Sequence, residues 1–517
     1  MQKKVPLSEK EKKEWYIKDV LIDSIPGISL HRVYDSILVN HNNEEGKEII
    51  IAILDSEIDI DHEELKNNIW KNIDEIPGNG IDDDNNGYID DVYGWNFLGN
   101  SKGDNNNFTS YEYTRYLKKY NSNFKGKKYE EIEPKDSILF RNYLRAIDKY
   151  ESQLKYAKED LEYGNMLSSS MKNVKKEIAK FISYTDYTIK DLDSLKNIFP
   201  NNKELQEAII IRSNFIKYSF TQNYIDNYKL NAEERINKLL NLKFDDRKIT
   251  GDDSEDINDI NYGNSFVNKN INLFTHGTEV AGTILNLKNK NVKIMPVCVS
   301  PMGDEHDKDI ALGIRYAVDN GAKVINMSFG KEFSLHTEWV FDAFKYAEKH
   351  NVLIVSSCGN SKYNLTNYND YYPNDNINNG KEVCDNFILV GGITNNLSKK
   401  ILYRHSNYGS IDVDVFAPAD DIYTTTPNNG YKLDSGTSLA SAITSGVAGL
   451  IYSYYPNLTA SQVKHILMNS GLEYTFEVAT PTKEDKKKTT PFNKLSKSGK
   501  VLNAYNAFIM ADSISRK

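Results

Sequence analysis

Three polar residues stand at the edges of apolar segments, where side chains that do chemistry usually lie in α/β proteins. Asp55 ends the apolar run 49–54, His276 precedes a helix of small residues, and Ser438 opens an apolar helix. Each alone would be an ordinary turn former or helix start. A serine hydroxyl, however, becomes a strong nucleophile only when a base removes its proton, and a carboxylate sets the tautomer of that base. Together the three residues predict acyl transfer with Ser438 as nucleophile, His276 as base and Asp55 as its partner.

A fourth residue fits the same chemistry. Asn360 follows an apolar run and a glycine, so we expect its side chain at the end of a strand. Its amide could donate a hydrogen bond to the oxyanion that forms when Ser438 attacks a carbonyl group. The backbone N–H of Ser438, at the start of a helix, would be the second donor.

The segments around these residues predict a parallel sheet with helices on both faces. Short β-branched or apolar runs alternate with helical patterns over 309–320 and 338–350. Continuous apolar strands are typical of parallel sheets, in which functional groups gather at the carboxyl ends of the strands. The predicted strands are 49–54, 292–299, 323–327, 352–356, 387–390 and 411–416.

These motifs resemble those of the subtilisin-like serine proteases (subtilases, peptidase family S8). The residues that carry the resemblance are Asp55-Ser56, His276-Gly277-Thr278, Asn360 and Gly436-Thr437-Ser438, in the Asp, His, Ser order of subtilisin. The resemblance covers roughly residues 49–100 and 270–470 and implies a three-layer α/β fold with a mainly parallel sheet. It also implies a serine endopeptidase that acts on polypeptides through an acyl-enzyme intermediate.

The resemblance also implies where a substrate binds. Backbone groups of Ser328, Phe329 and Gly330 would pair with the substrate as an added strand, and Ser357 and Gly359 would belong to the opposite wall of the specificity pocket.

Four residues depart from the family pattern. Two are acids, Glu57 after Asp55-Ser56 and Glu279 after Thr278, and two, Leu439 and Ala442, follow Ser438 in place of Met and Pro. If these acids are close to His276 in space, they favour its protonated form and move optimal activity to higher pH.

Residues 104–250 differ in composition from the rest of the chain. They hold two of the 29 glycines and carry a net charge of +5, against −14 for the remainder. Phe140, Ile147, Leu154 and Leu161 recur every seven residues, which predicts helices. We therefore predict a helical insertion that either packs on its own body or acts as an arm for a partner. The predicted domains are a catalytic domain over 49–103 and 251–475, an N-terminal extension over 1–48 and a C-terminal segment over 476–517.

An Asp-rich and Asn-rich turn between the Asp and His motifs predicts a structural Ca²⁺ site. Its oxygen-bearing residues follow the alternating positions of a calcium loop, with Gly87 at the sharp turn. The other interpretation is an acidic turn without an ion. The candidate ligands are Asp82, Asp84, Asn86, the carbonyl oxygen of Tyr88, and Asp90.

Overall composition excludes several classes of protein. The net charge of −9 argues against a nucleic-acid binder, and no apolar stretch approaches the ~18 residues of a transmembrane helix. Residues 1–15 lack the apolar run of a secretory signal peptide. The three cysteines, Cys298, Cys358 and Cys384, have no paired spacing, which predicts buried thiols instead of disulfides or a zinc site.

The run 76–97 is most similar to subtilases of Bacteroidetes-type bacteria, which are typically exported, so the resemblance implies an extracytoplasmic location. The alternative function is a catalytically silent subtilase-fold binding protein that presents the 104–250 arm to a partner.

Overall fold

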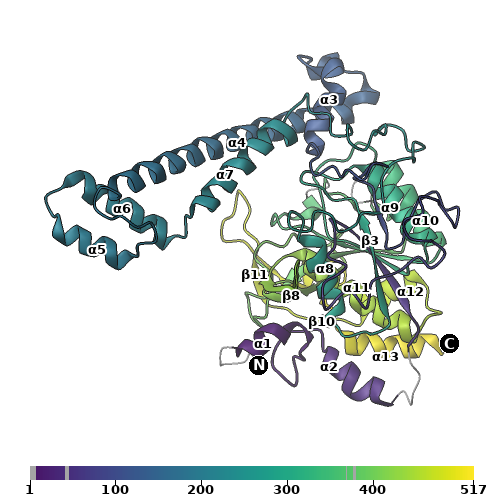
Figure 1. Cartoon of the computed structure of the whole chain (residues 1–517). Coiled ribbons are helices and arrows are strands. Elements are labelled where there is room, and N and C mark those ends of the chain that lie inside the picture. Colours follow the sequence, from purple (N-terminus) through teal and green to yellow (C-terminus); the bar gives the residue numbers. More distant parts are fainter. Residues whose placement is uncertain (1–6, 41–45, 368–369, 377–379, 517) are drawn as a thin grey trace. The chain divides into compact units, whose positions relative to one another are not determined.

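The computed structural model describes residues 7–40, 46–367, 370–376 and 380–516. The chain divides into two compact units (Figure 1). Unit 1 comprises Met1–Asn107 and Arg247–Lys517, and unit 2 comprises Phe108–Asp246. Residues 1–6 and 41–45 of the predicted extension 1–48, and Lys517 of the predicted C-terminal segment, lie outside the described residues.

Unit 1 is built on a nine-stranded sheet with the strand order β10-β13-β7-β6-β5-β4-β1-β3-β2. All neighbouring strands pair in parallel except β10 and β13. Two small antiparallel pairs, β8-β9 and β11-β12, lie outside it. The strands are β1 Ile49–Asp55, β2 Trp95–Asn96, β3 Val292–Cys298, β4 Val324–Met327, β5 Leu353–Ser357, β6 Phe387–Ile393, β7 Val415–Pro418, β8 Ile422–Thr426, β9 Gly430–Asp434, β10 Leu472–Glu473, β11 Glu477–Ala479, β12 Thr489–Pro491 and β13 Lys500–Val501.

Helices cover both faces of this sheet, which explains its continuous apolar strands. In β1 every residue except Ile50 is buried. Helix α11 packs across β4, β5, β6 and β7 and against α8, whereas α9 packs on β1 and β3 and α10 on β5 and α9 (Figure 1). This is the expected three-layer α/β arrangement. The helices of these layers are α8 His276–Leu285, α9 Asp307–Asp319, α10 Thr337–Lys349, α11 Thr437–Tyr454 and α12 Ala460–Asn469.

The strand order changes direction at β1, and this decides where the functional groups meet. β1 lies between β3 on one side and β4 on the other, with which it pairs in parallel. Connections that leave in opposite directions open a crevice at the carboxyl ends of such strands. Asp55 is the last residue of β1. It therefore lies in this crevice.

Most of the predicted strands begin and end within two or three residues of the observed ones, but the prediction of 411–416 is wrong at its start. The strand there, β7, begins only at Val415. Asp414 explains the delay, because its side chain accepts a hydrogen bond from the backbone N–H of Leu389 at 2.8 Å. The carboxylate thereby takes a donor from the neighbouring strand β6.

The segment before β1 is part of the core of unit 1. Trp15 and Ile28 are fully buried in the same hydrophobic core as the sheet. The indole N–H of Trp15 donates to the carbonyl oxygens of Asp420 and Asp421, at 3.0 and 3.2 Å. The two ends of the chain also meet, since the N–H of Ala504 donates to the carbonyl oxygen of Ile28 at 2.7 Å. The terminal helices are α1 Glu9–Glu14, α2 Leu30–Arg32 and α13 Ala504–Ser515.

Unit 2 is helical, as predicted, with a 42-residue helix α4 that packs against α3, α6 and α7. The heptad positions do not form its core, however. Phe140 is buried, whereas Ile147, Leu154 and Leu161 are half-buried. Small residues such as Gly164 lie at the interface, where a methyl group would be only 2.7 Å from the Lys229 side chain of α7. The helices are α3 Glu112–Phe124, α4 Ser137–Ile178, α5 Ile189–Ile198, α6 Lys203–Lys217 and α7 Gln222–Glu234.

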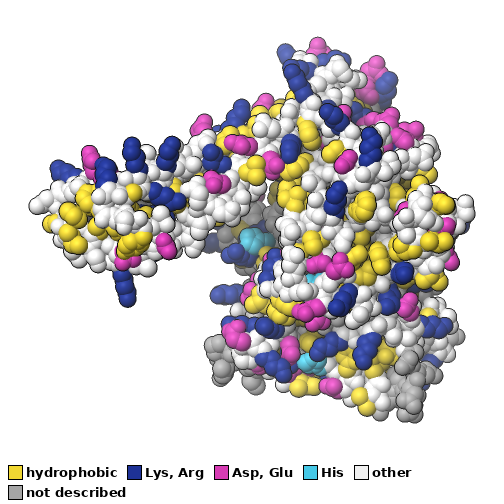
Figure 2. Space-filling view, viewed as in Figure 1, with side chains coloured by type: hydrophobic (Ala, Val, Ile, Leu, Met, Phe, Trp, Pro, Cys, Tyr) yellow, Lys and Arg dark blue, Asp and Glu magenta, His cyan; other side chains and the backbone are white. Residues whose placement is uncertain are grey.

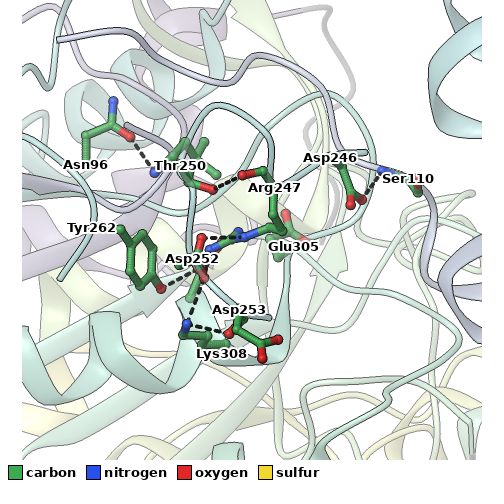
Figure 3. A network of polar contacts seen from close by, with 12 residues as sticks. Asn96, Ser110, Asp246, Arg247, Thr250, Asp252, Asp253, Tyr262, Glu305 and Lys308 are labelled. Carbon is green, nitrogen blue, oxygen red and sulfur yellow. Dashed lines mark hydrogen bonds and ion pairs between the residues drawn. The ribbon is translucent and has the colours of Figure 1, made fainter. Parts of the chain in front are cut away.

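Unit 1 resumes at Arg247, whereas the insertion was predicted to continue to residue 250. Arg247 donates to both Asp252 and Asp309, at 2.7–3.0 Å, and Tyr262 donates to Asp309 at 2.6 Å (Figure 3). Lys308 completes the group by donating to Asp252 at 2.7 Å. Burial alone would raise the pKa of Asp252, but the charge and hydrogen bonds of Arg247, with Lys308, lower it to about 2. This buried ionic group holds residues 247–252 to α9.

Two further sequence predictions can be compared with the described part of the chain. Cys298, Cys358 and Cys384 are all buried and free, as expected. Among the residues that the structure describes, no helix has the length and apolar character needed to cross a membrane.

Candidate active site

The carboxylate of Asp55 and the imidazole of His276 form a hydrogen-bonded pair. The distances from Nδ1 of His276 to the two carboxylate oxygens are 2.8 and 3.0 Å. The Asp55 side chain is 2% exposed, whereas that of His276 is 43% exposed. A proton on Nδ1 is therefore held by a buried carboxylate, which leaves Nε2 free to accept a proton at the surface of the crevice.

Gly277 allows this pair to form. Its N–H donates to the hydroxyl of Ser56 at 3.1 Å. A methyl group at Gly277 would lie 2.6 and 2.8 Å from the carbonyl oxygens of Ser56 and Glu57. Any larger residue would push the start of α8, and with it His276, away from the end of β1.

Acidic groups around His276 stabilise its charged form. Burial lowers the pKa of His276, but the charge and hydrogen bond of Asp55, followed by the charges of Glu279 and Asp434, raise it to about 9. Glu279 is held close by Thr275, whose hydroxyl donates to it at 2.7 Å. Lys432 forms ion pairs with Glu279 and Asp434, at 2.8 and 2.7 Å, and its positive charge partly offsets their negative charge.

The two acids that depart from the family pattern behave differently. Glu279 contributes to the raised pKa of His276, as the hypothesis requires. Glu57 instead accepts hydrogen bonds from Asn105, at 2.9 Å, and from Asn270. Burial raises the pKa of Glu57 itself. We therefore retain the hypothesis for Glu279 only.

Ser438 is the second residue of α11. Its hydroxyl donates to the carbonyl oxygen of Ser328 at 3.1 Å. The hydroxyl of Ser328 in turn donates to the carbonyl oxygen of Ser438 at 3.1 Å, and Asn326 donates to Ser328 at 2.8 Å. These bonds tie the end of β4 to the start of α11.

Asn360 lies beside the same helix start. Its side-chain oxygen accepts hydrogen bonds from the backbone N–H of Thr437 at 3.0 Å and from the Thr437 hydroxyl at 3.2 Å. With the oxygen engaged in this way, the amide nitrogen is the group left to donate; it lies 3.6 Å from where a methyl group at Gly436 would be. The donor of Asn360 thus lies close to Gly436, the residue directly before α11.

The predicted substrate-binding residues follow two neighbouring strands. Ser328, Phe329 and Gly330 come directly after β4, while Ser357 ends β5 and Gly359 follows it. A cavity of about 280 Å³ adjoins the Asp55–His276 pair and Ser328. Its other lining residues are Ser56, Leu273, Phe274, Thr275, Ser300, Pro301, Met302, Glu305 and Phe329.

Comparison with known proteins identifies the family. The model of the subtilase family matches residues 46–495. The chain belongs to the subtilase family.

Individual subtilases align with only part of this chain. The cell wall-associated protease of Bacillus subtilis is 33% identical over 42% of this chain and 23% of its own length. Subtilisin DY of Bacillus licheniformis is 32% identical over 38% of this chain and 70% of its own length. A solved lanthipeptide protease is 27% identical, with a TM-score of 0.36 over 46% of this chain and 75% of its own. The match thus spans from 23% to 75% of the length of these three proteins.

Several residues of this subtilase site were missed by sequence reasoning. Lys432 and Asp434 reach His276 from the hairpin β8-β9, and Glu305 lines the cavity. Burial, followed by the charge of Asp304, raises the pKa of Glu305 to about 7. None of these three residues stands in a motif with spacing of its own, so no sequence signal could have found them.

The predicted calcium ligands are only partly brought together. Carboxylate oxygens of Asp82 and Asp84 lie within 4.8 Å of each other and of Glu75, which sequence reasoning did not include. Asp90 points elsewhere, because its two oxygens accept hydrogen bonds from the backbone N–H groups of residues 78–80 at 2.7–3.1 Å. The side-chain oxygen of Asn86 accepts from the N–H of Tyr88 at 2.8 Å. The donors that fit a hard divalent cation are therefore Glu75, Asp82 and Asp84.

Proposed function

We propose that this subtilase is a serine endopeptidase that hydrolyses peptide bonds through an acyl-enzyme intermediate. The observation that carries the proposal is the bond between Nδ1 of His276 and the buried carboxylate of Asp55. This bond sets the tautomer that a general base requires. The pair lines the same cavity as Ser328, to whose carbonyl oxygen the Ser438 hydroxyl is bonded.

In the first half of the reaction, Nε2 of His276 takes the proton of Ser438 as Oγ attacks the carbonyl carbon of the substrate. The Oγ–C bond forms while the carbonyl electrons move to oxygen. The N–H of Ser438 and the amide of Asn360 donate to that oxyanion. The imidazolium, stabilised by Asp55, then gives its proton to the departing amine as the C–N bond breaks.

In the second half, a water molecule takes the place of the departed amine, and the steps of bond making and proton transfer run in the opposite order. His276 accepts a proton from water as its oxygen attacks the acyl carbon, and returns that proton to Oγ of Ser438 when the ester bond breaks. The products are a free carboxylate and the regenerated enzyme. Before the first half of the reaction can begin, the hydroxyl of Ser438 must break its hydrogen bond to the carbonyl oxygen of Ser328, which is 3.1 Å long in the resting enzyme.

Labelling with a fluorophosphonate probe tests the proposal on the full chain. Oγ of Ser438 displaces fluoride from phosphorus while His276 takes the hydroxyl proton, so a competent site is labelled covalently. The alternative, a catalytically silent binding protein, predicts no labelling. A correctly folded chain that stays unlabelled would overturn the proposal.

The acid limb of the pH–rate profile is expected to depend on Glu279. Because His276 must be neutral to act as a base and its pKa is about 9, kcat/KM should rise with pH up to about that value. Glu279→Gln removes a negative charge that favours the imidazolium, so the pKa falls and the acid limb moves to lower pH. The measurement is kcat/KM for one peptide substrate across pH, with Glu63→Gln, an exposed acid, as the matched control. An unshifted limb in Glu279→Gln would refute this role.

We also propose that Glu75, Asp82 and Asp84 hold a structural Ca²⁺. Binding to the folded state alone would stabilise it by about 2.7 kcal/mol at a calcium concentration about 100 times Kd, which thermal unfolding detects as a higher Tm. The double substitution Asp82→Asn and Asp84→Asn should abolish the increase, whereas Asp61→Asn, at an exposed acid outside the cluster, should not. Equal Tm values in excess CaCl2 and in chelator would reject the site and favour an acidic turn held by its own hydrogen bonds.

Two further predictions from the sequence still await a test, an extracytoplasmic location and a partner for the helical unit. Apolar side chains are exposed on α5, α6 and the segment between them (Figure 2), including Ile198 at 66% and Ile210 at 52%. Such side chains are compatible with a protein partner.

A further inference from the structure

The ends of β4 and β5 form two facing walls next to Ser438. The strands pair in parallel, with Met327 opposite Ser356. The chain continues from β4 into Gly330 and from β5 into Gly359, directly before Asn360. Both glycines border the same side chain, because a methyl group on either one would come into contact with the same atom.

That atom is the phenol oxygen of Tyr371. It would lie 2.1 Å from a methyl group at Gly330 and 2.3 Å from one at Gly359. Carbon atoms do not approach oxygen so closely, so only glycine fits at either position while Tyr371 is there. The Tyr371 side chain is 8% exposed. The phenol therefore fills the space between the two walls.

Backbone contacts hold Tyr371 in this position. The next residue, Tyr372, forms an antiparallel bridge with Lys331, with N–H to carbonyl distances of 2.8 Å in both directions. Asn374 donates to the carbonyl oxygen of Tyr371 at 2.6 Å. Lys331 is itself fixed by a buried ion pair with Asp307 at 2.8 Å. Tyr371 is thus built into the wall that begins at Gly330.

The substrate residue whose carbonyl is attacked must face this space. Its carbonyl oxygen has to reach the amide of Asn360 and the N–H of Ser438, and its backbone runs along residues 328–330. With these groups engaged, the adjacent Cα directs its side chain between Gly330 and Gly359. The phenol oxygen of Tyr371 is then the floor that the side chain meets.

We propose that Tyr371 makes this subtilase specific for polypeptides with a small residue, glycine, alanine or serine, on the acyl side of the cleaved bond. This inference rests on the proposed endopeptidase function and concerns the same site. A single methylene group is worth roughly 10–200-fold in kcat/KM when a pocket accepts or rejects it. An aromatic side chain exceeds alanine by several carbon atoms, so it should be rejected by at least about 100-fold.

The test compares two peptides that differ only in alanine or phenylalanine before the cleaved bond. Wild type should favour the alanine peptide by at least about 100-fold in kcat/KM. Tyr371→Ala should reduce that ratio by at least about tenfold, because it empties the space of one ring. Tyr371→Phe removes only the oxygen. It should therefore raise kcat/KM for a peptide whose side chain is one carbon longer than alanine, compared with kcat/KM for the alanine peptide. Tyr363→Phe, which loses a hydroxyl bonded to Glu332 at 3.3 Å, is the matched control and should change neither ratio.

Fluorophosphonate labelling of every variant distinguishes a failure of the role of Tyr371 from a failure of the proposed peptidase function. Labelled wild type that prefers the phenylalanine peptide overturns the role of Tyr371 while the peptidase function stands. An unchanged ratio in a labelled Tyr371→Ala has the same consequence. If Tyr371→Ala fails to fold, as judged by thermal unfolding, the wild-type ratio and Tyr371→Phe decide the question. Unlabelled, folded wild type instead removes the proposed function itself.

Discussion

Ser438→Ala is expected to lower kcat for peptide hydrolysis by about 10⁶-fold, the effect of removing the nucleophile in subtilisin. The substitution removes the only atom that forms the acyl-enzyme bond and leaves the rest of the site in place. The Ser438 hydroxyl makes one hydrogen bond, to Ser328 at 3.1 Å, so the loss of stability should be small. Steady-state hydrolysis of a peptide substrate and fluorophosphonate labelling measure the effect together.

The control for this experiment is Ser441→Ala, which removes a hydroxyl one turn further along α11. That hydroxyl donates to the carbonyl oxygen of Ser438 at 2.8 Å and contacts Ser328. It has no part in bond making, so activity should fall far less than in Ser438→Ala. If Ser438→Ala kept the activity of wild type, the nucleophile would have to be another group and the reading of the site would be wrong.

The second large effect is expected for Asp55→Asn, with a decrease in kcat of about 10⁴-fold. The amide can donate to Nδ1 of His276, which favours a proton on Nε2, the atom that must accept one from Ser438. The negative charge of Asp55 is also lost. Since that charge is the largest contribution that raises the pKa of His276, the pKa should fall from about 9.

Kinetics across pH and an NMR titration of His276 measure the two consequences of Asp55→Asn separately. The control is Asp61→Asn, at an exposed position outside the His276 pair. Activity near that of wild type in Asp55→Asn would show that the carboxylate does not set the tautomer. A His276 pKa that stayed at about 9 would show that other charges raise it.

The chemistry of the site was largely readable from the sequence because each residue stands beside a strong local signal. A run of β-branched residues ends at Asp55, and small residues follow His276 and Ser438 where helices begin. Such patterns depend on neighbours in the chain. They also located most of the central strands, whereas β7 began late because Asp414 bonds to a neighbouring strand.

The predicted calcium loop shows what residue spacing alone does not describe. The alternating spacing of oxygen-bearing residues suggested Asp90 as a ligand, but its carboxylate bonds to the backbone of residues 78–80. Glu75, which joins Asp82 and Asp84, lies outside the repeat. The loop folds back on itself, and this folding decides which carboxylates lie within reach of one another.

By itself the sequence predicted the candidate reacting groups and their order, the parallel strands that carry them and the helical character of the inserted unit. Only the tertiary structure decided the environment of those groups. Lys432, Asp434 and Glu279 surround His276 from two different elements, and Tyr371 closes the space between two strand ends. The physical reason is that the pKa of a base and the depth of a pocket depend on distances of a few ångströms between residues far apart in the chain. Local periodicity carries no information about those distances.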